Sequence, residues 1–117
     1  MRVRPACKPT ETQLGSFAAF QLLLGALSSQ DAGATVRLSG VNLQVVSGSG
    51  STGGAVNGRG NVIIGYNTDN LGDGADTRTG SHNLVIGDDH SYTSSGGFVG
   101  GQDNVISEAG ATVLTGS

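Results

Sequence analysis

The stretch "GSHNLVIGDDHSYTSSGGFVGGQDNVIS", residues 80–107, places an apolar residue at every seventh position. The series runs through Val85, Tyr92, Val99 and Ile106, and Val113 continues it beyond the stretch. Glycines repeat at twice that distance, because Gly87 and Gly101 are fourteen residues apart. The sequence therefore has a repeating unit of seven residues, or of fourteen when two units are paired.

A coiled coil is the usual source of a seven-residue apolar period. Here, however, the heptads contain glycines together with many Ser, Thr, Asn and Asp residues, and each glycine inside a helix costs about 1 kcal/mol. A strand of four or five residues followed by a two-residue corner also occupies seven positions. We therefore predict a mainly β fold, a flattened solenoid with fourteen-residue coils, preceded by a short N-terminal helix.

Each class of residue has a role in such a coil. Val85, Val99 and Val113 are expected to stack in one sheet, and Tyr92 and Ile106 in another, with neighbouring coils about 4.8 Å apart. Glycine and asparagine tolerate the backbone conformations of tight corners. The predicted turn residues are Gly65, Asn83, Gly87, Gly101 and Asn104.

The chain divides into four predicted segments. Residues 1–30 are either a short oligomer-forming helix, which we favour because apolar residues recur at spacings of three and four, or a signal-like region. Residues 35–46 alternate apolar and polar side chains as a strand does. Residues 47–57 form a joint rich in Gly and Ser, and residues 58–117 form the repeat region.

A coil this thin buries too little apolar surface to be stable alone. Leu84 and Ile86 beside Val85, and Leu114 beside Val113, are expected to point away from the first ladder and to form a second apolar face. We infer that this face is covered by identical chains.

Composition excludes several classes of function. The net charge is −3 with only 6 Lys and Arg residues, so a nucleic-acid partner is not expected. The few aromatic residues cannot line a deep ligand pocket, and the apolar run in the first thirty residues is too short for a membrane span. Cys7 is the single cysteine, which leaves no disulfide within the chain and no cysteine-based zinc site.

Four short segments resemble the head repeats of trimeric autotransporter adhesins of the YadA-like type. They are "NVIIG" at 61–65, "NLVIG" at 83–87, "GFVGG" at 97–101 and "TVLTG" at 112–116. The resemblance covers about half the chain, and the insert "YNTDNLGDGADTRT" interrupts it. It implies a left-handed parallel β-roll and a homotrimer.

The expected function is that of a non-enzymatic structural or adhesive module at the cell surface or outside the cell, with a cell-surface or matrix receptor as a possible partner. A second hypothesis is a segment of a phage or injection-particle fibre. A third is a calcium-stabilised or ice-binding solenoid.

Two groups of polar residues are candidates for a metal or catalytic site. Asp69, Asp73 and Asp76 offer oxygen ligands for calcium, although an ordinary acidic loop is the favoured interpretation. Asp88, Asp89 and His90 follow a predicted strand whereas His82 precedes it, so these groups are not expected to converge. The sequence predicts no catalytic residue and no cofactor.

Overall fold

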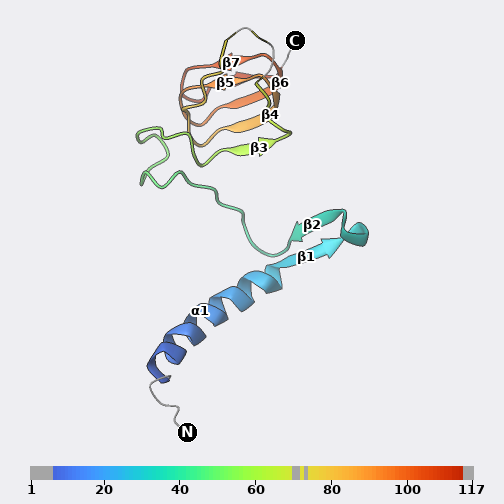
Figure 1. Cartoon of the computed structure of the whole chain (residues 1–117), viewed down its shortest axis with the longest axis vertical. Coiled ribbons are helices and arrows are strands. Elements are labelled where there is room, and N and C mark those ends of the chain that lie inside the picture. Colours follow the sequence, from blue (N-terminus) through green and yellow to red (C-terminus); the bar gives the residue numbers. More distant parts are fainter. Residues whose placement is uncertain (1–6, 70–71, 73, 115–117) are drawn as a thin grey trace. The chain divides into compact units, whose positions relative to one another are not determined.

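The computed structural model describes residues 7–69, 72 and 74–114, with residues 7–16 described by their backbone alone. Contacts divide the chain into two units, Met1–Leu43 and Gln44–Ser117. Figure 1 labels the elements of both units. Asp73, one of the three candidate calcium ligands, lies outside the described residues.

The first unit consists of a helix and a pair of strands. In helix α1 (Cys7–Ala26), Pro9 lies in the first turn, where a missing N–H is tolerated. Strand β1 (Leu27–Gln30) follows directly, then the short turn η1 (Asp31–Gly33) and strand β2 (Thr35–Leu38). The strands pair antiparallel, with Leu27 opposite Leu38.

The predicted strand at 35–46 is shorter in the structure. Strand β2 ends at Leu38, and no strand occurs in residues 39–46. Gly40 has a φ of 74°, a left-handed conformation that turns the chain out of an extended path.

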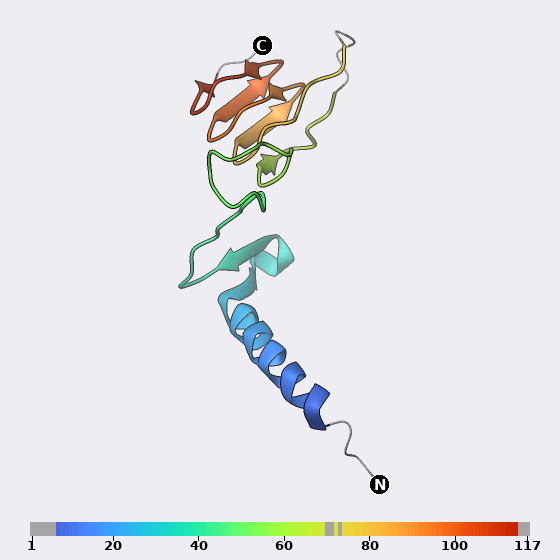
Figure 2. The same cartoon turned by 90° about the vertical axis from the view of Figure 1, so that its left-hand side faces the viewer.

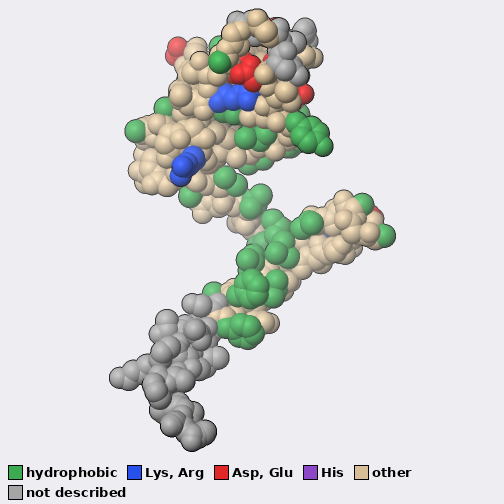
Figure 3. All heavy atoms as spheres, viewed as in Figure 1, with side chains coloured by type: hydrophobic (Ala, Val, Ile, Leu, Met, Phe, Trp, Pro, Cys, Tyr) green, Lys and Arg blue, Asp and Glu red, His purple; other side chains and the backbone are tan. Residues whose placement is uncertain are grey.

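Helix α1 exposes apolar side chains on all sides of its described part. Phe17, Phe20, Leu22, Leu23 and Leu24 are exposed, and Leu22 reaches 79%. Consecutive positions point in different directions around a helix. Figure 3 shows hydrophobic side chains gathered along this segment.

The second unit contains two parallel sheets. Strands β3 (Val62–Ile64), β4 (Leu84–Asp88), β6 (Phe98–Gln102) and β8 (Thr112–Val113) form the larger sheet, in that order. Strands β5 (Ser91–Tyr92) and β7 (Val105–Ile106) form the smaller one. The members of each sheet lie one above another (Figures 1 and 2).

Strand register reflects the repeat over part of the chain only. Val85 lies opposite Val99, Val99 opposite Val113, and Tyr92 opposite Ile106, each pair being fourteen residues apart. Between β3 and β4, in contrast, Ile63 lies opposite Val85, an offset of 22. The extra residues belong to the excursion at residues 66–79, the insert that interrupts the repeats.

The predicted fold class is therefore wrong. The chain is a small α/β structure with one described helix, an antiparallel pair and two parallel sheets, rather than a mainly β left-handed β-roll or solenoid. A twenty-residue helix and the antiparallel pair occupy the first unit, and the fourteen-residue register does not extend to β3. The solenoid was predicted for residues 58–117, but the regular period covers only residues 80–113.

The core of the second unit is small. Val85 and Val99 are fully buried, and Tyr92 and Ile106 are nearly so. Val113 and Ala111 pack against this cluster while remaining partly exposed. The side chains face inward from both sheets, because residues at alternate positions of a strand point to opposite faces.

The opposite face of the larger sheet is mostly apolar and open. We call it the outer face, and it carries the side chains that alternate with the buried ones: Val62, Ile64, Leu84, Ile86, Phe98, Thr112 and Leu114 around Gly100, with Asp88 and Gln102 where β4 and β6 end. Ile64 is 53% and Leu114 59% exposed. A Cβ built on Gly100 would lie within 4.0 Å of Ile86, Phe98 and Leu114, which places these side chains around one point.

Left-handed corners recur at every seventh residue of the repeats. His82, Asp89, Gly96, Asp103 and Gly110 all have φ between 57° and 72°. Asn83 and Asn104, which the sequence analysis placed in such corners, each follow a left-handed residue instead. The corner positions therefore precede the asparagines by one residue, and His and Asp occupy some of them because polar residues enter this region more readily than branched ones.

Candidate functional site

A ladder of side-chain acceptors joins successive strands at the point where each strand begins. The Asn83 backbone N–H donates to Asn61 Oδ1 at 2.9 Å, and the Gly97 N–H donates to Asn83 Oδ1 at 2.8 Å. Asn83 is buried, and its amide nitrogen also donates to the Ser94 carbonyl. These asparagine oxygens therefore act as acceptors for backbone N–H groups where the next strand begins.

His90 has the same role in the smaller sheet. The Asn104 N–H donates to His90 Nδ1 at 3.3 Å, fourteen residues along the chain, as the Gly97 N–H does to Asn83. Asn104 therefore corresponds to His90 rather than to Asn83. Asn83 thus precedes a strand of the larger sheet, whereas Asn104 precedes a strand of the smaller sheet.

The hydrogen bonds of His90 fix its tautomer. Because Nδ1 accepts from a backbone N–H, Nε2 carries the proton and donates to the Ile86 carbonyl at 2.9 Å. The side chain is fully buried. Both nitrogens of this imidazole are therefore committed to the backbone.

His82 is engaged in the same way at another place. The Ser47 N–H donates to His82 Nε2 at 2.9 Å, and Nδ1 lies 3.0 Å from the Thr52 carbonyl, to which it donates. The ring holds the Gly/Ser-rich segment beside the strands, next to an open hollow of about 500 Å³ lined by residues 44–48, 50–52 and His82. The two histidines contact different parts of the backbone. All four of their ring nitrogens pair with backbone groups rather than with a hydroxyl nucleophile.

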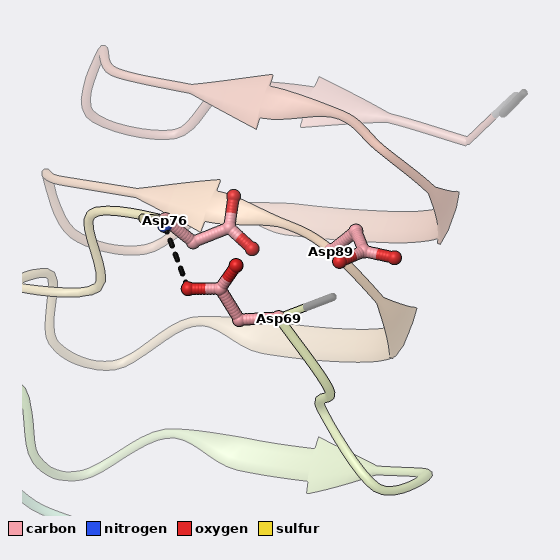
Figure 4. A group of neighbouring side chains, drawn as sticks. All are labelled: Asp69, Asp76 and Asp89. Atoms are coloured by element: carbon pink, nitrogen blue, oxygen red, sulfur yellow. Dashed lines mark hydrogen bonds between the residues drawn. The ribbon is translucent and has the colours of Figure 1, made fainter. Parts of the chain in front are cut away.

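Three carboxylates converge near the excursion. Oxygens of Asp69, Asp76 and Asp89 lie within 4.8 Å of one another, and Figure 4 shows the first two pointing toward each other. Asp69 and Asp76, two of the three candidate calcium ligands, are thus brought together, and Asp89, from the other candidate group, joins them. The 22-residue offset between β3 and β4 brings residue 69 back beside the corner at Asp89.

Each of these carboxylates already interacts within the protein. The Asp76 N–H donates to Asp69 Oδ2, the Ser91 hydroxyl donates to Asp76 Oδ1, and Asp89 has an interaction of its own. Arg78 forms a 3.0 Å ion pair with Asp76 Oδ2. We interpret the cluster as part of the attachment of the excursion, and the acidic side chains alone assign no metal to it.

Arg78 is the centre of this attachment, a role that was not predicted from the sequence. Its guanidinium donates to the carbonyls of Asn67 and Thr68 in the excursion and of His90 in the repeats, in addition to Asp76. A single planar group thus satisfies three carbonyl oxygens. In the sequence, only its position among acidic and turn residues could have indicated this role.

Replacing Arg78 with lysine is expected to lower the free energy of unfolding by about 2 kcal/mol, because an ammonium group cannot reproduce the forked geometry. Circular dichroism during urea unfolding would measure this loss. Arg59→Lys is the matched control, since no side-chain hydrogen bond of Arg59 occurs in the described part of the chain. An equal loss in both variants would contradict the role given to Arg78.

Comparison with known proteins adds no relative from which a role could be transferred. The chain matches no protein-family model, no curated protein and no solved structure. Within the described residues, no helix combines the length and apolarity that crossing a membrane requires.

Proposed function

We propose that this chain is a non-enzymatic structural or adhesive surface module that associates with copies of itself, as a homotrimer located outside the cell. The exposed apolar surface of α1 carries the proposal. The resemblance of the four repeat segments to the heads of trimeric autotransporter adhesins supports the surface role and the number three.

Helix α1 needs partners. A helix that is apolar on all sides is normally buried on all sides, and the described part of α1 exposes five large apolar side chains between residues 17 and 24. The neighbouring two-stranded sheet is too small to be stable alone. Copies of the same helix supply a partner of matching chemistry.

Three helices suit this surface better than two. In a pair of helices, each buries one narrow stripe along the partner, and the remaining sides stay in water. In a bundle of three, each helix contacts two others and buries a wider arc. Phe17, Phe20 and Leu24 recur at spacings of three and four, and Leu22 and Leu23 widen the apolar arc around them.

A non-enzymatic role agrees with the site geometry. Both imidazoles are bonded through both nitrogens to the backbone. The converging carboxylates are bonded to Arg78, Ser91 and a backbone amide. The polar residues of the repeats thus act mainly in holding the chain to itself.

Light scattering on the purified chain is expected to give three times 11.6 kDa. The double variant Phe20→Asp, Leu24→Asp is expected to abolish the trimer, because burying either carboxylate between helices costs several kcal/mol. Gln21→Asp, which adds a charge without removing an apolar side chain, is the control and should weaken association less. A monomeric native chain would reject the proposal.

A further inference from the structure

We propose that His82 is an acid-sensitive attachment point for the Gly/Ser-rich segment 47–57. A neutral imidazole holds residues 47–52 against the repeats, and a protonated one releases them. The inference is independent of the proposed self-association, because every group involved lies within the second unit.

His82 occupies a corner at which the repeats otherwise have glycine. Gly60, Gly96 and Gly110 stand at the equivalent positions, two residues before β3, β6 and β8, with φ between 71° and 77°. His82 has a φ of 59°, a left-handed conformation that is less favourable for a residue with a side chain than for glycine. The contacts of the imidazole offset this backbone cost.

The Gly/Ser-rich segment packs directly beside this stack of corners. A Cβ built on Gly60 would lie 2.6 Å from the backbone nitrogen of Ser47, so the segment occupies the space that a side chain would need. The Ser47 N–H donates to His82 Nε2, and His82 Nδ1 donates to the Thr52 carbonyl. In the part of the chain that the structure describes, these are the only hydrogen bonds between residues 47–52 and the repeats.

The two hydrogen bonds require a neutral ring in one tautomer. A backbone N–H can only donate and a carbonyl can only accept, so the proton lies on Nδ1 and the lone pair of Nε2 faces Ser47. Protonation places a hydrogen on Nε2 as well. Two donors then face each other, and the hydrogen bond to Ser47 is lost.

The surroundings of the ring admit protons and do not compensate for this loss. The ring is partly exposed and lines the open hollow of about 500 Å³. The segments packed around it, residues 44–61, 80–83 and 93–97, contain no Asp, Glu, Lys, Tyr or Cys. Arg59 is their one charged residue; it is exposed, and its charge has the same sign as that of an imidazolium.

Release lengthens the flexible connection to the first unit. Asn57 stays attached through the Ser81 hydroxyl, whereas Ser47 keeps only the exposed hydrogen bond that its carbonyl accepts from the Asn57 amide. The first firmly attached residue thus moves from Ser47 to Asn57. The roughly ten residues between them have the composition of a flexible linker once they are released.

Hydrogen exchange at the Ser47 amide tests the inference, with the rates corrected for the intrinsic effect of pH. We expect its protection to fall about tenfold between about pH 7.5 and about pH 5. The Gly97 amide is the internal control, because its acceptor, Asn83 Oδ1, does not titrate, and its protection should change less than about twofold. Constant protection at Ser47, or an equal loss at Gly97, would overturn the inference.

Two further measurements assign the effect to the imidazole. His82→Asn removes the titrating group and suits a left-handed corner, so Ser47 protection in this variant should be equal at both pH values. A pH dependence that persisted would assign the effect to another group. Nitrogen-15 NMR of the native ring should show the proton on Nδ1 at about pH 7.5 and on both nitrogens at about pH 5. A proton on Nε2 at the higher pH would contradict the proposed attachment.

Discussion

Replacing Gly87 with alanine is expected to lower the free energy of unfolding by about 4 kcal/mol. Gly87 has a φ of 110°, a region that side chains rarely enter, and this strain alone costs about 1–3 kcal/mol. A Cβ there would also collide with the carbonyl oxygen of Gly101 on the next strand and lie 3.2 Å from His90 Nε2. Overpacking of this kind adds about 1–3 kcal/mol.

Two other glycines separate these causes. Gly96 has a φ of 71° with nothing within 4 Å of a built Cβ, so Gly96→Ala should show the backbone strain alone, about 1–2 kcal/mol. Gly100 has no such backbone and only ordinary contacts from 3.7 Å, so Gly100→Ala should be neutral or slightly stabilising. Urea unfolding of the three variants, followed by circular dichroism, measures the order. Equal losses at Gly87 and Gly96 would contradict the stacked contact with Gly101.

The seven-residue period of the sequence located the buried positions but not the fold. Val85, Tyr92, Val99 and Ile106 are the buried apolar residues of the second unit. A period found over thirty residues does not show where it stops. The offset of 22 between β3 and β4 is the distance between the "NVIIG" and "NLVIG" segments, and it is not a multiple of seven. The helix and the antiparallel pair follow from local preferences in the first forty residues, which the repeat does not govern.

The contacts of the polar residues were harder to predict than the apolar core. The type of residue at a corner can be predicted, since His, Asp and Gly enter left-handed backbone. The asparagines beside the corners were predicted to be corner residues because they recur in the repeated segments. The guanidinium of Arg78 reaches the carbonyls of Thr68 and His90 through the folding of the excursion, and no spacing along the sequence encodes these contacts. The two backbone partners of His90 could not be predicted either, because they come beside the ring only in the folded chain.

Replacing His90 with alanine is expected to cost about 4 kcal/mol of unfolding free energy. The change removes a fully buried ring and leaves the Asn104 N–H and the Ile86 carbonyl without the partner each now has. Each such loss costs about 1–3 kcal/mol, and the cavity adds to it.

His90→Asn provides the decisive comparison, because Asn61 and Asn83 show that an asparagine oxygen can accept the N–H of the next strand. We expect His90→Asn to recover about half of the lost stability and to keep the Asn104 amide protected from hydrogen exchange, while His90→Ala exposes it. His82→Ala should instead release the amide of Ser47, which donates to His82, and leave Asn104 protected. If His90→Asn and His90→Ala lost equal stability and equal protection at Asn104, the imidazole would be acting by volume alone. The expected result would make His90 the aromatic member of the acceptor ladder, filling the core with its ring while its Nδ1 does the work of an asparagine oxygen.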